Sequence, residues 1–297
     1  MVTVRCLQSE TTYLMKPHLM KNSTRQRNLT DIVKPAQMVK HASAWADRVL
    51  PPRQGLTILI YHQVGGGTEG AVDTPVVEFT FQMESLVASG MVVTLDEGLR
   101  RLLTADPTPG VVVTFDDGTA DFTDIAVPIM VAHGIPSLLY AETGPITSGQ
   151  PNASGHRPTS WTSLRDATST GLVTVGSHTH THRLLNGLDK AAAADELDRS
   201  IDVISENLGY APEHFAYPKA VDGSAEANSE VHSRFRSAAL GGGRSNVIGA
   251  DPFRLQRTPI QRSDTRSMFA SKIRGGMRLE GILRQGVSVR RYRNAVR

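Results

Sequence analysis

Continuous runs of β-forming residues alternate with amphipathic segments along most of this 297-residue chain. The runs LTILIYHQV (56–64) and GVVVTF (110–115) are typical of strands that are buried on both faces. Segments such as FTFQMESLVASG (79–90) have helical periodicity and end in a glycine that can close a helix. Strands that alternate with helices favour a parallel sheet with the helices outside it. We therefore expect an α/β fold, a single-domain parallel (β/α) barrel that is distorted or incomplete and carries basic terminal extensions.

The remaining predicted elements follow the same alternation. The other expected strands are MVVTL (91–95), PSLLYA (136–141), LVTVGSH (172–178), HFAYP (214–218) and LQRTPI (255–260). The other expected helices are a short one near Ala36–Val49, TDIAVPIMVAHG (123–134), SWTSLRDATSTG (160–171) with Ser160 as N-cap, DKAAAADELDRSIDVISENLG (189–209) and NSEVHSRFRSA (228–238).

Charge is distributed unevenly and divides the chain into three parts. Residues 1–54 carry nine Lys or Arg and three acids, and residues 266–297 carry nine against one, whereas residues 55–265 carry 14 basic and 25 acidic side chains. We therefore predict a basic N-terminal extension (1–54), an acidic central domain (55–265) and a basic C-terminal tail (266–297). Basic tails suit nucleic acid or an anionic membrane, but solvated tails are the simpler interpretation, so no nucleic-acid partner is expected.

Targeting signals are not evident in this sequence. The first 50 residues contain no apolar run of the length of a signal peptide, and no stretch approaches the roughly 20 apolar residues that span a bilayer. The single cysteine, Cys6, excludes a disulfide within the chain. The expected location is therefore the cytoplasm, without a transmembrane segment.

Polar clusters follow four of the predicted strands: His62, Asp116–Asp117, SHTHTH (177–182) and Tyr217–Pro218. Because chemistry in parallel α/β folds gathers at the carboxyl ends of the strands, these clusters are expected at one edge of the barrel. Two adjacent carboxylates repel each other unless a cation lies beside them. Imidazoles together with carboxylates match the ligands of Zn²⁺ or a similar divalent ion, which would allow both acids to stay ionised.

The motifs TFDDG and HTHTH resemble those of the polysaccharide deacetylases, the NodB-homology domain of carbohydrate esterase family four, and the resemblance covers roughly residues 56–262. It implies that Asp116 is the general base. It also implies one divalent ion, zinc or alternatively cobalt or nickel, with three protein ligands: Asp117, His178 and His182. His180 falls at a position that the family does not require, and is interpreted as an outer or surface residue.

The third motif departs from the family pattern, Phe-Arg-x-Pro-Tyr/Phe-Gly, because this chain reads FAYPKA. Ala216 replaces the arginine that holds the catalytic aspartate, and Lys219 replaces an aromatic residue whose backbone N–H helps to form the oxyanion hole. The resemblance assigns Tyr217 and Lys219 to the substrate and oxyanion site.

The late Leu-x-His motif of the family is absent, since no histidine follows His232. ILIYHQV and LQRTPI instead resemble segments of the subgroup that deacetylates poly-N-acetylglucosamine. In this subgroup the N-terminal histidine, here His62, acts as general acid. Arg257 would then take the place of the missing arginine beside Asp116.

The resemblance implies a metal-dependent hydrolase that removes N-acetyl groups from an N-acetylglucosamine-type oligo- or polysaccharide and releases acetate. Two alternatives stay open. The altered third motif is compatible with a non-catalytic carbohydrate-binding relic of the same fold. The HTH at 178–180 could also be the His-x-His of an amidohydrolase-type enzyme, although its histidines would then be expected before the acids rather than after them.

Overall fold

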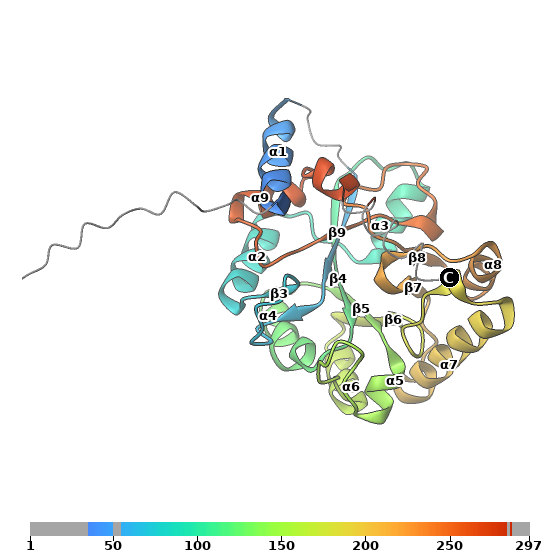
Figure 1. Cartoon of the computed structure of the whole chain (residues 1–297). Helices are drawn as coiled ribbons and strands as arrows, with labels where there is room; N and C mark the ends of the chain where they lie inside the picture. Colours follow the sequence, from blue (N-terminus) through green and yellow to red (C-terminus); the bar gives the residue numbers. More distant parts are fainter. Residues whose placement is uncertain (1–34, 50–54, 284–285, 287–297) are drawn as a thin grey trace, which may run out of the picture. The chain divides into compact units, whose positions relative to one another are not determined.

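The computed structural model describes residues 35–49, 55–283 and 286, which all belong to one compact unit (Figure 1). Among these residues, no helix combines the length and the apolar character needed to cross a bilayer. The proposed domain boundaries stay a prediction, and most of the predicted N-terminal extension lies outside the described residues.

Seven parallel strands form the central sheet, in the order β8-β7-β6-β5-β4-β1-β9 (Figure 1). Leu255 bridges to Ala239 of β8 in parallel, and the strand that follows it pairs with β1, so the sheet is nearly closed on itself. The prediction of a distorted parallel (β/α) barrel is thereby confirmed. The strands are β1 (Leu56–Tyr61), β4 (Gly110–Asp117), β5 (Ser137–Ala141), β6 (Val173–Ser177), β7 (His214–Ala216), β8 (Ser237–Ala239) and β9 (Arg257–Pro259), with β2 (Gln63–Val64) and β3 (Asp73–Thr74) paired separately.

Helices surround this sheet and begin or end largely where the sequence predicts. Ser160 caps α6 by accepting a hydrogen bond from the Ser163 amide, and α2 and α7 end at left-handed glycines, Gly90 and Gly209. The helices are α1 (Pro35–Val49), α2 (Val76–Ser89), α3 (Leu95–Leu103), α4 (Val127–Ala132) with a preceding π-helical turn (Phe122–Ala126), α5 (Thr143–Ser148), α6 (Trp161–Ser169), α7 (Lys190–Leu208), α8 (Ala225–Arg234) and α9 (Arg266–Lys272).

Two predicted elements are wrong in part. MVVTL forms only one bridge, Val92 to Val111, and α3 begins at Leu95, because the Thr94 side chain accepts a hydrogen bond from the Glu97 amide and caps a new helix. The helix predicted at 228–238 ends at Arg234, and its last residues belong to β8. β8 is made of Ser and Ala, which have little strand propensity, so its burial in the sheet rather than its sequence determines its conformation.

The alternation of side chains along the strands separates the outer core from the barrel interior. Phe115 and Leu139 belong to a buried cluster together with residues of the surrounding helices. Leu138 and Tyr140 belong to a different cluster, with Ala216 of β7. Since successive strand residues point to opposite faces, Asp116 shares the inward face with Tyr140. The interior therefore becomes polar towards the carboxyl ends of the strands.

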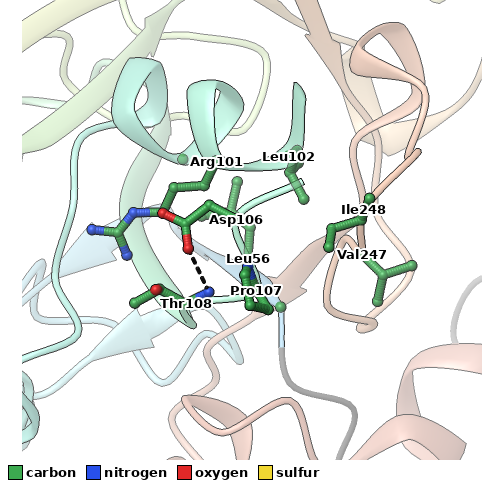
Figure 2. Close-up of a pocket in the computed structure, with 10 residues that line it drawn as sticks. Leu56, Arg101, Leu102, Asp106, Pro107, Thr108, Val247 and Ile248 are labelled. Atoms are coloured by element: carbon green, nitrogen blue, oxygen red, sulfur yellow. Dashed lines mark hydrogen bonds between the residues drawn. The ribbon is translucent and has the colours of Figure 1, made fainter. Parts of the chain in front are cut away.

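A cavity of about 270 Å³ lies at the opposite edge of the barrel (Figure 2). Leu56, the first residue of β1, lines it together with Leu102 of α3 and the exposed pair Val247 and Ile248. Asp117, His178 and His62 lie at the other ends of their strands, so this cavity is separate from them.

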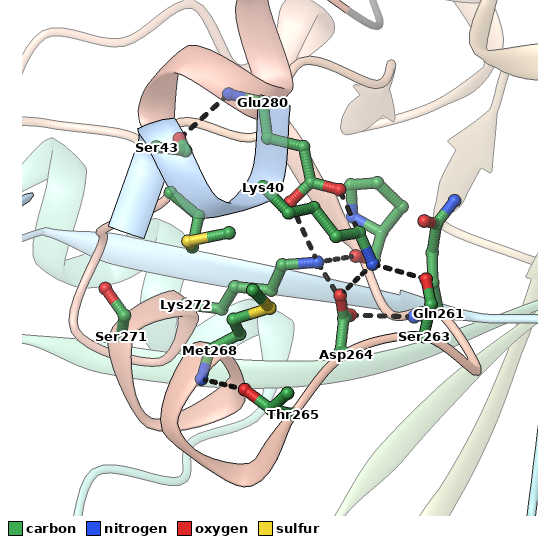
Figure 3. A network of polar contacts seen from close by, with 12 residues as sticks. Lys40, Ser43, Gln261, Ser263, Asp264, Thr265, Met268, Ser271, Lys272 and Glu280 are labelled. Carbon is green, nitrogen blue, oxygen red and sulfur yellow. Dashed lines mark hydrogen bonds and ion pairs between the residues drawn. The ribbon is translucent and has the colours of Figure 1, made fainter. Parts of the chain in front are cut away.

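Helix α1 is tied to the C-terminal part of the domain by four buried charged side chains: Lys40, Asp264, Lys272 and Glu280 (Figure 3). Lys40 pairs with Asp264, and the Lys272 Nζ lies 2.7 Å from Asp264 Oδ2 and 3.4 Å from Glu280 Oε2. Lys272 also donates a 2.7 Å hydrogen bond to the carbonyl of Pro259 in β9. Two cations balance two anions, so the loss of any one leaves an unpaired buried charge.

We expect Lys40→Met to destabilise the protein by about 3–5 kcal/mol, because it removes one partner from this buried cluster. The free energy of unfolding, measured with denaturant, checks this. Lys190→Met is the matched control: Lys190 is 71% exposed and pairs with Glu230 at the surface, so its loss should hardly change the unfolding midpoint. An unchanged midpoint for Lys40→Met would show that α1 is not held by this cluster.

Candidate active site

The predicted catalytic residues come from five strand ends of the barrel. Asp116 and Asp117 end β4, His178 follows β6, and Arg257 begins β9. His62 directly follows β1, and Lys219 lies in a 3₁₀ turn after β7, Pro218–Ala220. The structure thus gathers side chains that are up to 195 residues apart in the sequence.

Asp117, His178 and His182 form a cluster whose ligand atoms all lie within 4.8 Å of one another. The Asp117 Oδ1 is 3.7 Å from His178 Nε2 and 3.6 Å from His182 Nε2. Ligands about 2.0–2.1 Å from one tetrahedral ion lie roughly 3.3–3.5 Å apart, so these separations suit a Zn²⁺ ion with little adjustment. This donor set, two imidazoles and one carboxylate, fits the ion that the sequence predicts.

The protonation state of the two histidines also suits a metal. The His178 Nδ1 lies 2.7 Å from the Ala216 carbonyl, which can only accept, so Nδ1 carries the proton and Nε2 keeps its lone pair. Burial lowers the pKa of His178. Burial, followed by the nearby His178, lowers the pKa of His182 to about 3. Both rings are therefore neutral near pH 7, the form that binds metal.

Two of the three clustered residues have left-handed backbone conformations, with φ of 72° at Asp117 and 57° at His182. Such values are uncommon for residues other than glycine and gather at functional sites, where the surrounding structure maintains them. They turn both side chains away from the direction that a regular strand would give, and towards His178.

Asp116 forms a bidentate ion pair with Arg257. The guanidinium Nη1 and Nη2 donate to the two carboxylate oxygens at 2.6 and 2.8 Å, and its Nε donates to the Leu240 carbonyl at 3.1 Å. Both residues are buried. Burial alone would raise the pKa of Asp116, but the Arg257 charge outweighs it and holds that pKa well below its usual range. Asp116 is therefore ionised, and Arg257 occupies the place beside it that Ala216 leaves open.

The other predicted residues differ in where their side chains lie. The Nδ1 of His62 is buried and has no hydrogen-bond partner among the described residues. Lys219 is exposed at the site with a left-handed φ of 53°, and its charge contributes to lowering the pKa of His182. Tyr217 points away from the site: its hydroxyl donates to Asn228 Oδ1 and its ring packs against Phe215 in a buried cluster.

His180 is accounted for by contacts away from the metal cluster. Arg199 lies 2.9 Å from its Nε2 and can only donate, so this nitrogen accepts and Nδ1 donates to the Thr143 hydroxyl at 2.9 Å. Both ring nitrogens are thus occupied, which agrees with the prediction that His180 is an outer residue.

Glu142 is a buried acid of this site that the sequence analysis did not single out. It follows β5 and is 5% exposed. Burial, and then the neighbouring Asp117 carboxylate, raise the pKa of Glu142 to about 7. The only sequence signal was its position, an acid directly after the predicted strand PSLLYA.

The motif-bearing part of the chain is similar to a known family. A family model described as polysaccharide deacetylase matches residues 104–233, which include Asp116, Asp117, His178 and His182. This part of the chain is similar to the polysaccharide deacetylases. This match agrees with the resemblance that the two motifs indicate.

Among curated proteins, this chain is similar to YxkH of Bacillus subtilis, which is named a putative polysaccharide deacetylase. The two are 27% identical over 158 residues, which is 52% of each chain, so this chain matches about half the length of that relative.

Solved deacetylases share the fold. The deacetylase PplD of Streptococcus pyogenes, solved in complex with acetate, covers 73% of this chain and 97% of its own, with 17% identity and a TM-score of 0.65. IcaB from Ammonifex degensii covers 74% of this chain and 96% of its own, with 23% identity and a TM-score of 0.61. At these identities the likeness shows the fold alone.

Proposed function

We propose that this protein is a metal-dependent hydrolase that removes N-acetyl groups from an N-acetylglucosamine-type oligo- or polysaccharide and releases acetate. The observation that carries the proposal is the ionised Asp116 directly beside the Asp117, His178 and His182 cluster, at one edge of the barrel. A general base next to a metal site can activate water for the hydrolysis of an amide.

The residues of the chain take separate roles. Asp116, fixed by Arg257, accepts a proton from the attacking water. When bound, a divalent ion, zinc or alternatively cobalt or nickel, supplies Lewis-acid polarisation of the acetyl carbonyl and activation of water. The Lys219 amide, which has no hydrogen bond within the described part of the chain, donates to the oxygen that becomes negative. His62 donates a proton to the leaving amine.

The packing of Tyr217 changes one part of this assignment. Because its ring and hydroxyl are used inside the domain, we assign the substrate contact of this segment to Lys219 rather than to the Tyr217 side chain. Lys219 also stands where the family motif has an aromatic residue, so this side of the proposed sugar site is charged rather than apolar.

Acetate release tests the proposal. Protein purified without a metal-affinity tag is incubated with a tetramer of N-acetylglucosamine, before and after chelation, and then with zinc added back. We expect acetate from the untreated and the zinc-restored samples only. A protein that binds the tetramer but releases no acetate in any sample would favour the carbohydrate-binding relic.

We expect His62→Ala to keep the metal and the fold but to lower kcat on the tetramer by roughly 10²–10⁴-fold, because the leaving amine loses its acid. The loss should be much smaller for an activated aryl acetate, whose leaving group needs no proton. Steady-state kinetics on both substrates check this, and equal losses would instead assign His62 to positioning.

A further inference from the structure

Glu142 is a buried carboxylate at the barrel edge to which the mechanism above gives no role. It is 5% exposed, and its side chain makes no hydrogen bond or ion pair to the residues that the structure describes. Glu196, which is 4% exposed, differs: its carboxylate accepts hydrogen bonds from the amides of His180 and Thr181 and from the Thr181 hydroxyl. Of these two acids, Glu196 alone has side-chain partners in the described part of the chain.

The backbone directs Glu142 towards the metal cluster. Its φ of −79° and ψ of 100° continue the extended path of β5, so its side chain shares the inward face with Tyr140. Its amide donates to the Asp117 carbonyl at 3.1 Å, and the His178 amide donates to the carbonyl of the preceding Ala141 at 3.0 Å. Glu142 therefore lies between the strands that carry Asp117 and His178.

The Glu142 oxygens are not among the fully buried atoms that lack a partner, so they reach the open edge of the barrel, where a molecule from outside can contact them. The nearby Asp117 has the same charge and repels the Glu142 carboxylate. The charge of Lys219 favours the ionised form of Glu142, but Lys219 makes no ion pair with any described residue. Since no described residue supplies a donor to this carboxylate, we look for that donor on a bound molecule.

We propose that Glu142 is a substrate-binding residue that accepts a hydrogen bond from an O–H or N–H group of the glycan, beside the acetamide that is cleaved. This inference rests on the proposed function, since it places a glycan at this edge of the barrel. A sugar ring carries donors next to each acetamide, and a partly deacetylated chain also carries ammonium groups. Glu142 would contribute to the recognition of the sugar rather than to the cleavage of the amide.

The test compares Glu142→Leu and Glu142→Gln with the wild type, all loaded with zinc. The substrates are a fully acetylated tetramer, a partly deacetylated tetramer and an aryl acetate without sugar. For Glu142→Leu we expect KM on the tetramers to rise about 10–100-fold with little change in kcat, and no change on the aryl acetate. Glu142→Gln keeps an acceptor oxygen. If the donor of the glycan is a hydroxyl, the rise in KM for this variant should therefore be smaller than for Glu142→Leu. If KM of Glu142→Gln rises as much as that of Glu142→Leu, but only on the partly deacetylated tetramer, the donor is an ammonium group of that substrate.

Controls separate this role from others. Zinc content should stay at the wild-type level, and the melting temperature should not fall, because the change removes a buried carboxylate without partners. Glu206→Gln, on the exposed face of α7, should leave all parameters unchanged. A wild-type KM for Glu142→Leu, a loss of zinc, or an equal loss on the aryl acetate would each overturn the inference.

Calorimetric binding of the tetramer distinguishes this inference from the proposed function. If the wild type binds the tetramer without releasing acetate, the proposed function fails. Weaker binding by Glu142→Leu would still support the role of Glu142 in that case, and equal binding would overturn it.

Discussion

Replacing both Asp117 and His182 by alanine is expected to remove nearly all metal from the purified protein and to abolish acetate release. Damage to a metal shell typically costs 10–100-fold in affinity or more, and the double variant leaves only His178 of the three clustered ligands. Elemental analysis of protein purified without an affinity tag should show zinc, cobalt or nickel near one ion per chain in the wild type. Unfolding midpoints confirm that the variant is folded.

His180→Ala is the matched control for this experiment. His180 lies two residues from His182, but its ring nitrogens bind Arg199 and Thr143, so its loss should leave the metal content unchanged. Full metal retention in the double alanine variant would refute the assignment of the ligands.

Asp116→Asn is expected to keep the metal while lowering kcat by about 10²–10⁴-fold, because asparagine cannot accept the proton of the attacking water. Metal analysis and kinetics on the tetramer check both parts. The change also leaves the buried Arg257 without its anionic partner, so some loss of stability should accompany it.

Asp116→Asn with Arg257→Leu controls for that loss of stability. The double variant lacks both charges, and we expect it to unfold later than Asp116→Asn while it stays equally inactive. A single Asn variant that loses both metal and fold would instead make Asp116 a structural residue.

The sequence predicts the chemical part of the site better than its surroundings. Asp116, Asp117, His178 and His182 lie in two short motifs directly after or within predicted strands, so their gathering at one edge follows from the parallel sheet. The pairing of Arg257 with Asp116 was implied by a subgroup resemblance, and the structure places the two side chains in contact.

The surroundings depend on packing that periodicity does not encode. The inward direction of Glu142 follows from the register of β5, and the outward direction of Tyr217 from its contacts with Phe215 and Asn228. Lys40 belongs by composition to a basic extension, yet it is buried against Asp264. Side chains more than 200 positions apart along the chain make that contact, which no local pattern could show.

The segment from Leu255 to Pro259 has a consequence for the order in which the protein assembles. Leu255 joins β8, Pro259 joins β1, and Arg257 between them neutralises Asp116 from 141 positions further along the chain. During synthesis, β1 and β4 to β8 emerge from the ribosome before this segment, so Asp116 has no buried counter-charge until barrel closure. Because contacts between residues this far apart form slowly, we expect the ion pair of Asp116 with Arg257 to form late in folding. A nascent chain that stops short of β9 would thus lack both the barrel closure and a working base.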